Sequence, residues 1–137
     1  MFQFETKIRV RYAETDQMGY VYYGNYATYY EVARVESLRS LGFTYRELEE
    51  QGVIMPVLEY NSKFIRPAQY DDHLIIKTII KEKPGTRMRF NYEVYKENSS
   101  QLLNLGETTL VFVSKETGRP CEIPEMMKNL LFRFFDE

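Results

Sequence analysis

The start of the chain alternates between inward-facing and charged side chains. From Phe4 to Tyr12, every second residue is apolar or neutral, and the intervening positions are charged: Glu5, Lys7, Arg9 and Arg11. This period of two predicts a half-buried β-strand. The alternation stops between Ala13 and Gly19, where Thr15, Asp16 and Gly19 favour a turn.

The pattern changes to a helical period between Gly24 and about Leu41. Apolar and small residues recur there every three or four positions, at Tyr26, Tyr30, Ala33, Ser37 and Leu41. We expect Asn25, or a residue one or two positions earlier, to be the N-cap and Gly42 to end the helix. Glu31 and Arg34 are three residues apart, so we expect them to form an ion pair. Because most sides of this helix are apolar, it is predicted to lie at the centre of the fold.

The remaining chain is mostly extended. Thr44 to Gln51 reads as a short helix capped by Thr44, with Glu47 three residues on. Four strands are then predicted, at 53–66, 74–81, 86–96 and 102–114, followed by a short helix or turn at 124–132. Tight turns between consecutive strands force antiparallel neighbours.

These elements predict one α+β domain spanning residues 1–137. An antiparallel sheet needs a cover for its apolar face, and the helix at 24–41 is the long apolar element that can supply it. We therefore expect a curved five-stranded sheet wrapped around a central helix. The sheet leaves further apolar residues on its other side, which predicts pairing of subunits.

Composition excludes several kinds of chemistry. With one histidine (His73) and one cysteine (Cys121), a zinc cluster within the chain is not expected. The net charge of −2 disfavours nucleic acid as a partner. The sequence has neither an apolar run long enough for a membrane span nor a signal-peptide pattern, so we expect a cytoplasmic protein. Gly-Xaa-Ser-Xaa-Gly and phosphate-loop motifs are absent, which leaves carboxylate chemistry or simple binding.

The candidate site lies where the first turn meets the central helix. Asp16 precedes the helix, and Gly19 and Gly24 allow the backbone to approach a bound molecule closely. The first-turn N–H groups of a helix stabilise an anion. A thioester carbonyl develops negative charge as it is attacked, so this pairing of carboxylate and helix start suits thioester hydrolysis. The alternative role for Asp16 is to cap its own turn, and Glu31 is the second candidate acid.

Two segments carry a resemblance to a known family. One runs from Arg11 to Arg34 and contains Arg-Tyr-Ala-Glu-Thr-Asp-Gln-Met-Gly-Tyr-Val-Tyr-Tyr-Gly-Asn-Tyr, followed by Tyr-Tyr-Glu-Val-Ala-Arg. The other is Lys-Phe-Ile-Arg-Pro-Ala at 63–68, followed by two aspartates at 71–72. The chain resembles the 4-hydroxybenzoyl-CoA thioesterase family of the hotdog-fold superfamily, and also its acyl-CoA thioesterase branch.

The resemblance implies an acyl-CoA thioesterase that needs no metal or cofactor, since CoA is part of the substrate. It implies a homodimer that assembles into a homotetramer, with the active site across the dimer interface. Asp16 would act as nucleophile or general base, and the backbone N–H of Tyr23 would polarise the thioester carbonyl. Many relatives carry Tyr-His where this chain has Tyr22-Tyr23, which argues against a histidine side chain in the reaction.

Other residues are expected to bind the substrate. Gly19, Gly24 and Asn25 surround the reactive groups, and Lys63, Arg87 and Arg89 are candidates for the CoA phosphates, with Lys83 and Arg119 as further ones. His73 and Cys121 are expected to have no chemical task. The alternatives left open are a non-catalytic acyl-CoA-binding protein, a thioesterase for acyl-carrier-protein substrates, and a hydratase or dehydratase, which would need a histidine near the helix start.

Overall fold

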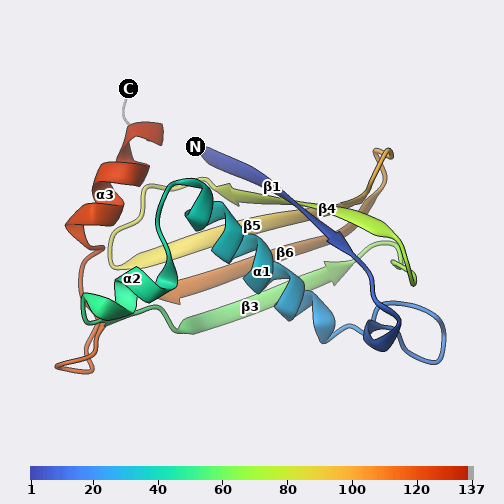
Figure 1. Cartoon of the computed structure of the whole chain (residues 1–137), viewed down its shortest axis with the longest axis horizontal. Coiled ribbons are helices and arrows are strands. Elements are labelled where there is room, and N and C mark those ends of the chain that lie inside the picture. Colours follow the sequence, from blue (N-terminus) through green and yellow to red (C-terminus); the bar gives the residue numbers. More distant parts are fainter. Residues whose placement is uncertain (136–137) are drawn as a thin grey trace.

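The computed structural model describes residues 1–135 and contains a five-stranded antiparallel sheet. Its spatial order is β1-β4-β5-β6-β3. The strands are β1 (Phe2–Arg9), β3 (Val57–Phe64), β4 (His73–Ile80), β5 (Arg87–Lys96) and β6 (Leu102–Val111). Helix α1 (Asn25–Ser40) lies across one face of this sheet (Figure 1). The predicted α+β hotdog architecture is confirmed.

Short elements surround this frame. They are η1 (Tyr12–Glu14), α2 (Tyr45–Glu50), β2 (Val53–Ile54), β7 (Val113–Ser114), α3 (Glu125–Leu131) and η2 (Phe132–Phe134). Thr44 caps α2 as predicted, because its hydroxyl accepts the backbone N–H of Glu47 at 3.2 Å. The end of α1 is also as predicted, since Gly42 follows it with a φ of +87°.

Three predicted strands are shorter in the structure. The strand expected at 102–114 divides at Phe112 into β6 and β7, which belong to different sheets. The strand expected at 53–66 divides at Pro56, and its first part pairs with β7 instead of β6. The strand expected to reach Tyr12 ends at Arg9, where its pairing with β4 stops at His73. Tyr12 instead begins η1 and is 76% exposed. Local hydrogen bonds among residues 11–15 replace the ladder there, which simple alternation cannot reveal.

The core lies between α1 and the concave face of the sheet. Tyr29, Tyr30, Ala33 and Leu38 of α1 are buried, and every second residue of β5 is buried as the alternation predicted: Met88, Phe90, Tyr92 and Val94. The ring of Tyr30 stacks on that of Tyr92, with centroids 4.3 Å apart. One face of the helix is thus buried against the sheet, whereas Ala27, Thr28, Glu31 and Val32 are exposed, so the prediction that most sides of the helix are enclosed is wrong. The first turn of the helix lies beside the 12–24 segment.

The predicted Glu31–Arg34 ion pair is wrong. Glu31 is exposed, whereas Arg34 is 5% exposed and turns into the core. Its guanidinium donates to the hydroxyls of Tyr45 and Tyr92, at 2.9 and 3.0 Å. Phenol oxygens from α2 and β5 therefore take the place of a carboxylate, and spacing along one helix cannot identify such partners. Between residues 1 and 135, no helix is long and apolar enough to cross a membrane.

Candidate active site

Asp16 closes a tight turn just before α1. Its Oδ1 accepts the backbone N–H groups of Met18 at 2.9 Å and Tyr20 at 3.2 Å. Gly19 donates its N–H to the Asp16 carbonyl and has a φ of +81°, which a residue with a side chain adopts at a cost. These bonds fix one carboxylate oxygen. The other, Oδ2, has no hydrogen-bond donor among residues 1–135.

The start of α1 leaves backbone donors without acceptors. Gly24 is the N-cap and makes no side-chain cap. The N–H groups of Tyr22, Asn25 and Tyr26 have backbone acceptors, whereas those of Tyr23 and Gly24 have none within the described chain. Both free N–H groups lie at the positive end of the helix dipole. They can donate hydrogen bonds to an oxygen atom on which negative charge develops.

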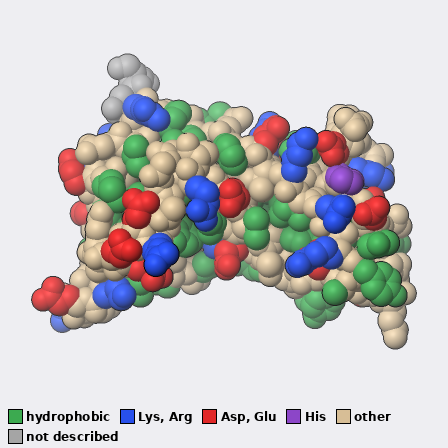
Figure 2. Space-filling model, viewed as in Figure 1, with side chains coloured by type: hydrophobic (Ala, Val, Ile, Leu, Met, Phe, Trp, Pro, Cys, Tyr) green, Lys and Arg blue, Asp and Glu red, His purple; other side chains and the backbone are tan. Residues whose placement is uncertain are grey.

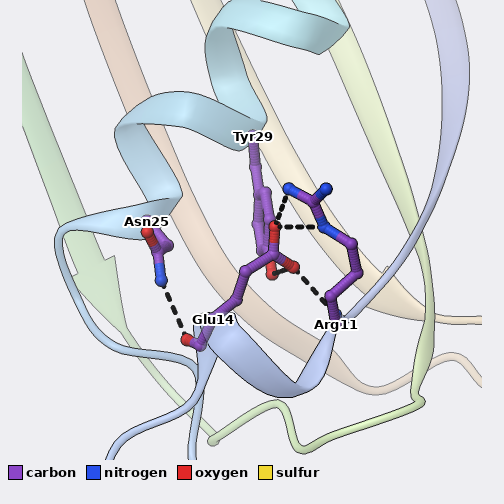
Figure 3. Close-up of polar contacts among 4 residues, drawn as sticks. All are labelled: Arg11, Glu14, Asn25 and Tyr29. Atoms are coloured by element: carbon purple, nitrogen blue, oxygen red, sulfur yellow. Dashed lines mark hydrogen bonds and ion pairs between the residues drawn. The ribbon is translucent and has the colours of Figure 1, made fainter.

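Asn25 does not have the capping role that the sequence predicted. It is the first residue of α1, and its Nδ2 donates to the backbone carbonyl of Glu14 at 2.8 Å (Figure 3). An N-cap side chain accepts hydrogen bonds from the helix, whereas this one donates to a segment eleven residues earlier. The N-cap is Gly24, within the one or two residues before Asn25 that the sequence left open, and Asn25 instead ties the helix to the preceding turn.

Asp16 and Tyr23 line the same open cavity of about 320 Å³. Its other lining residues are mostly apolar or aromatic: Met18, Tyr20, Val21, Tyr26, Phe64, Ile65, Arg66 and Pro67. Burial and the nearby Tyr60 and Asp72 raise the pKa of Tyr26 to about 12, so its hydroxyl stays protonated at neutral pH. The cavity therefore combines one carboxylate, one guanidinium and an apolar wall.

The predicted phosphate-binding residues lie elsewhere. Lys63 lines a separate surface hollow of about 310 Å³, together with Lys81. Arg87 is exposed at the start of β5, and Arg89 lies within 3.5 Å of Glu82 and 3.4 Å of Glu107. None of the three lines the cavity that holds Asp16. The structure thus brings together the two expected reactive groups but not these three cations.

His73 and Cys121, two other residues singled out in the sequence, do not belong to a common site. His73 begins β4 with its imidazole exposed and 3.6 Å from Glu97, and Cys121 is a free thiol. Across residues 1–135, no group of three or more histidine, cysteine or acidic side chains could hold a metal ion. Figure 2 shows acidic and basic side chains intermixed over the face it presents.

Sequence reasoning missed the cluster around Glu14. Its carboxylate accepts the backbone N–H of Arg11 at 2.8 Å, the Arg11 guanidinium and the hydroxyl of Tyr29 at 2.9 Å (Figure 3). The spacing of Arg11 and Glu14 was a usable signal for their pairing. The contact with Tyr29 was not visible, because it joins two elements.

The comparisons with known proteins all find similarity to thioesterases. The sequence profile of the thioesterase-like superfamily matches residues 10–131. The acyl-CoA thioester hydrolase YbgC of Escherichia coli O6:H1 is 33% identical over 122 residues, spanning 89% of this chain and 90% of that protein. YneP of Bacillus subtilis, named as a candidate acyl-CoA thioesterase, is 34% identical over 116 residues, or 85% and 83%. The crystal structure of DHNA-CoA thioesterase from Staphylococcus aureus matches with a TM-score of 0.84 at 33% identity, covering 98% of this chain and 87% of that one.

Proposed function

Because this chain belongs to the thioesterase-like superfamily, it is a thioester hydrolase, and we propose that Asp16 and the Tyr23 N–H carry out its reaction on acyl-CoA. One observation carries the proposal. A carboxylate with an unpaired oxygen and a backbone N–H without an acceptor line one cavity. Together these two groups can supply the attack on a thioester carbonyl and the stabilisation of its oxyanion.

The proposed reaction begins with the thioester carbonyl oxygen at the N–H of Tyr23. A water molecule gives a proton to Asp16 Oδ2 while its oxygen bonds to the carbonyl carbon, or Asp16 Oδ2 itself bonds to that carbon. Negative charge collects on the carbonyl oxygen, where the helix start stabilises it. The carbon–sulfur bond then breaks, and CoA leaves as the thiolate. On the second route this step leaves an acyl anhydride on Asp16, which water hydrolyses to the free acid and the carboxylate. No metal or cofactor takes part in this scheme.

The substrate groups are assigned by chemistry. The apolar wall formed by Tyr26, Phe64 and Ile65 suits the acyl group. Arg66 lies on the same cavity and joins Lys63 and Arg87 as candidates for the CoA phosphates. Arg89 is a weaker candidate than the sequence suggested, because Glu82 and Glu107 already lie beside it. Gly19, Gly24 and Asn25 shape the backbone around the thioester.

We further propose that the working form is a homodimer paired through β3. This strand is an edge of the sheet and exposes large apolar side chains at Val57, Leu58, Tyr60 and Phe64. An antiparallel pairing centred on β3 sets the Phe64 end against the partner's Val57 end. The cavity at 64–67 would then meet the partner's hollow of about 260 Å³ at 53–56. Pairing of dimers into a tetramer remains a prediction.

The test is CoA release from a panel of aliphatic and aromatic acyl-CoAs. We expect turnover by the wild type and a loss of roughly 10²- to 10⁴-fold in Asp16→Asn. Asparagine keeps an oxygen that can accept the Met18 and Tyr20 N–H groups, so the turn should persist. Asp71→Asn is the matched control, because Asp71 is an exposed aspartate with a φ of +67° that asparagine tolerates.

Undiminished turnover in a folded Asp16→Asn variant would contradict the mechanism. Tight acyl-CoA binding by the wild type without CoA release across the panel would favour the non-catalytic alternative. Hydrolysis of acyl-carrier-protein thioesters but not of acyl-CoA would show that the substrate is an acyl-carrier-protein thioester. The proposed roles of Asp16 and Tyr23 would then be unchanged.

A further inference from the structure

The free N–H of Tyr23 lies between Tyr22 and Asn25, which both donate hydrogen bonds to the same carbonyl oxygen. The Glu14 carbonyl accepts the backbone N–H of Tyr22 at 2.9 Å and the Nδ2 of Asn25 at 2.8 Å. Tyr23 and Gly24 span the gap between these two anchors. The position of one carbonyl therefore determines where the unpaired N–H groups point.

The side chain of Glu14 fixes that carbonyl in turn. It is 12% exposed and accepts the Arg11 backbone N–H at 2.8 Å, Arg11 Nη2 at 2.8 Å and the Tyr29 hydroxyl at 2.9 Å. Tyr29 is four residues after Asn25, so both lie on one side of the first turns of α1. Figure 3 shows Arg11, Asn25 and Tyr29 converging on Glu14 from the η1 segment and from the helix.

The same residue also sits next to the proposed acid. Asp16 follows Glu14 by two positions, and Thr15 between them is fixed by donating both its N–H and its hydroxyl to the Tyr12 carbonyl. Glu14 thus connects the segment that carries the carboxylate with the helix turn that carries the backbone donor. A shift of this residue changes the separation of the two reactive groups.

We propose that Glu14 and Asn25 are positioning residues that hold the Tyr23 N–H at the place where the thioester oxyanion forms. This inference rests on the function proposed above. Neither side chain lines the cavity, so neither is expected to touch the substrate. Their effect is on geometry, and a misplacement of about 1 Å near a reacting centre lowers rates by up to roughly 100-fold.

The main test substitutes Asn25→Ala, which removes the bond to Glu14 and leaves the free N–H groups present. Alanine is a better helix former than asparagine, so the variant is expected to fold. Because the oxyanion is stabilised in the transition state alone, we expect kcat to fall roughly 10- to 100-fold with KM within about twofold of wild type. Affinity for a non-hydrolysable acyl-CoA thioether, measured by calorimetry, is expected to be unchanged.

A second variant acts through Glu14 alone. Tyr29→Phe removes one donor from the Glu14 carboxylate and leaves the Asn25 bond intact. Its kcat is expected to lie between those of wild type and Asn25→Ala. Ser37→Ala is the control, because Ser37 is also buried on α1 and also loses a bond to a backbone carbonyl, that of Arg34 at 2.7 Å. Its kcat is expected to stay at the wild-type value.

The outcomes separate this inference from the proposed function. Wild-type turnover with unchanged kcat in Asn25→Ala overturns the inference alone, as does a loss confined to KM or to thioether affinity. An equal loss in Ser37→Ala also overturns it, because the effect would then be a general loosening of α1. If Asn25→Ala does not fold, unchanged kcat in Tyr29→Phe decides against it. A wild type without turnover on any thioester overturns the proposed function and the inference together.

Discussion

The Glu14 carboxylate is held by charge and by hydrogen bonds on several sides. Burial raises the pKa of this group, but hydrogen bonds from the Arg11 backbone, the Arg11 side chain and Tyr29, together with the Arg11 charge, lower it more. The net result is a pKa below that of a free glutamate. The folded protein therefore binds a proton at Glu14 less readily than the unfolded chain does.

This shift predicts a pH-dependent contribution to stability. A carboxylate with a lowered pKa stabilises the fold at neutral pH, and that contribution is lost as the pH falls below the pKa of an unfolded glutamate and through the lower pKa of the folded state. We expect urea unfolding to show a larger loss of stability on acidification in the wild type than in Glu14→Gln. Glu5→Gln is the control, because Glu5 is exposed on β1. Parallel pH profiles for the wild type and Glu14→Gln would contradict the prediction.

At the scale of residues, the sequence predicted positions better than partners. Asp16 and Tyr23 were singled out from a local motif, and the structure places both on one cavity, while their roles in the reaction stay a prediction. Asn25 and Arg34 were assigned partners along the chain, whereas they bond to Glu14, Tyr45 and Tyr92 across space. Hydrogen-bond partners between elements depend on packing, which a single sequence does not display.

Helix α1 and strand β6 meet at Gly106. A Cβ at this position would lie 2.3 Å from the ring of Tyr30. The same ring stacks on Tyr92, and its hydroxyl donates to Oδ1 of the buried Asn104 side chain. Glycine inside a strand usually weakens it, so its presence here is explained by the aromatic ring that takes the space of a side chain.

Gly106→Ala is expected to displace Tyr30 and to lower the free energy of unfolding by about 1–3 kcal/mol, measured in urea. Gly85→Ala is the matched control, because a Cβ at Gly85 would meet nothing closer than 4.0 Å and its φ is not positive. Equal stability of the two variants would show that Tyr30 moves aside without cost.

At the scale of elements, hydrophobic periodicity was sufficient for most of the fold. It located α1 and the strands β4, β5 and β6 to within a few residues. It misjudged the segment around Pro56, where two strands of different sheets follow one another, and the segment after Arg9, where side-chain hydrogen bonds replace the ladder. In both places a local interaction ends the strand, although the strand pattern in the sequence continues past that point.

The two edges of the sheet differ in character. The outward-facing positions of β1 are polar or charged, at Gln3, Glu5, Lys7 and Arg9, whereas β3 exposes several large apolar side chains. Charged residues on an edge strand oppose pairing with another chain. The asymmetry favours β3 as the edge that pairs in the proposed dimer.

We expect the wild type to sediment at about twice the 16.4 kDa mass of the chain, or at a higher multiple if dimers pair. Leu58→Lys places a charge on the β3 edge and is expected to yield monomers with reduced thioesterase activity and unchanged far-ultraviolet circular dichroism. Gln3→Lys places the same charge on the β1 edge and should leave the assembly intact. A monomeric wild type, or dissociation by Gln3→Lys but not by Leu58→Lys, would contradict pairing through β3.

The stacked rings of Tyr30 and Tyr92 are expected to contribute to the near-ultraviolet circular dichroism spectrum of the protein. The chain contains 12 tyrosines and no tryptophan. Its near-ultraviolet absorption at wavelengths longer than those that phenylalanine absorbs therefore comes from tyrosine. Tyr26, Tyr29, Tyr30 and Tyr92 are all buried around α1. Near-ultraviolet circular dichroism depends on fixed aromatic packing and disappears when that packing loosens. The spectrum of the unlabelled protein therefore reports on the packing between the central helix and the sheet that supports the candidate site.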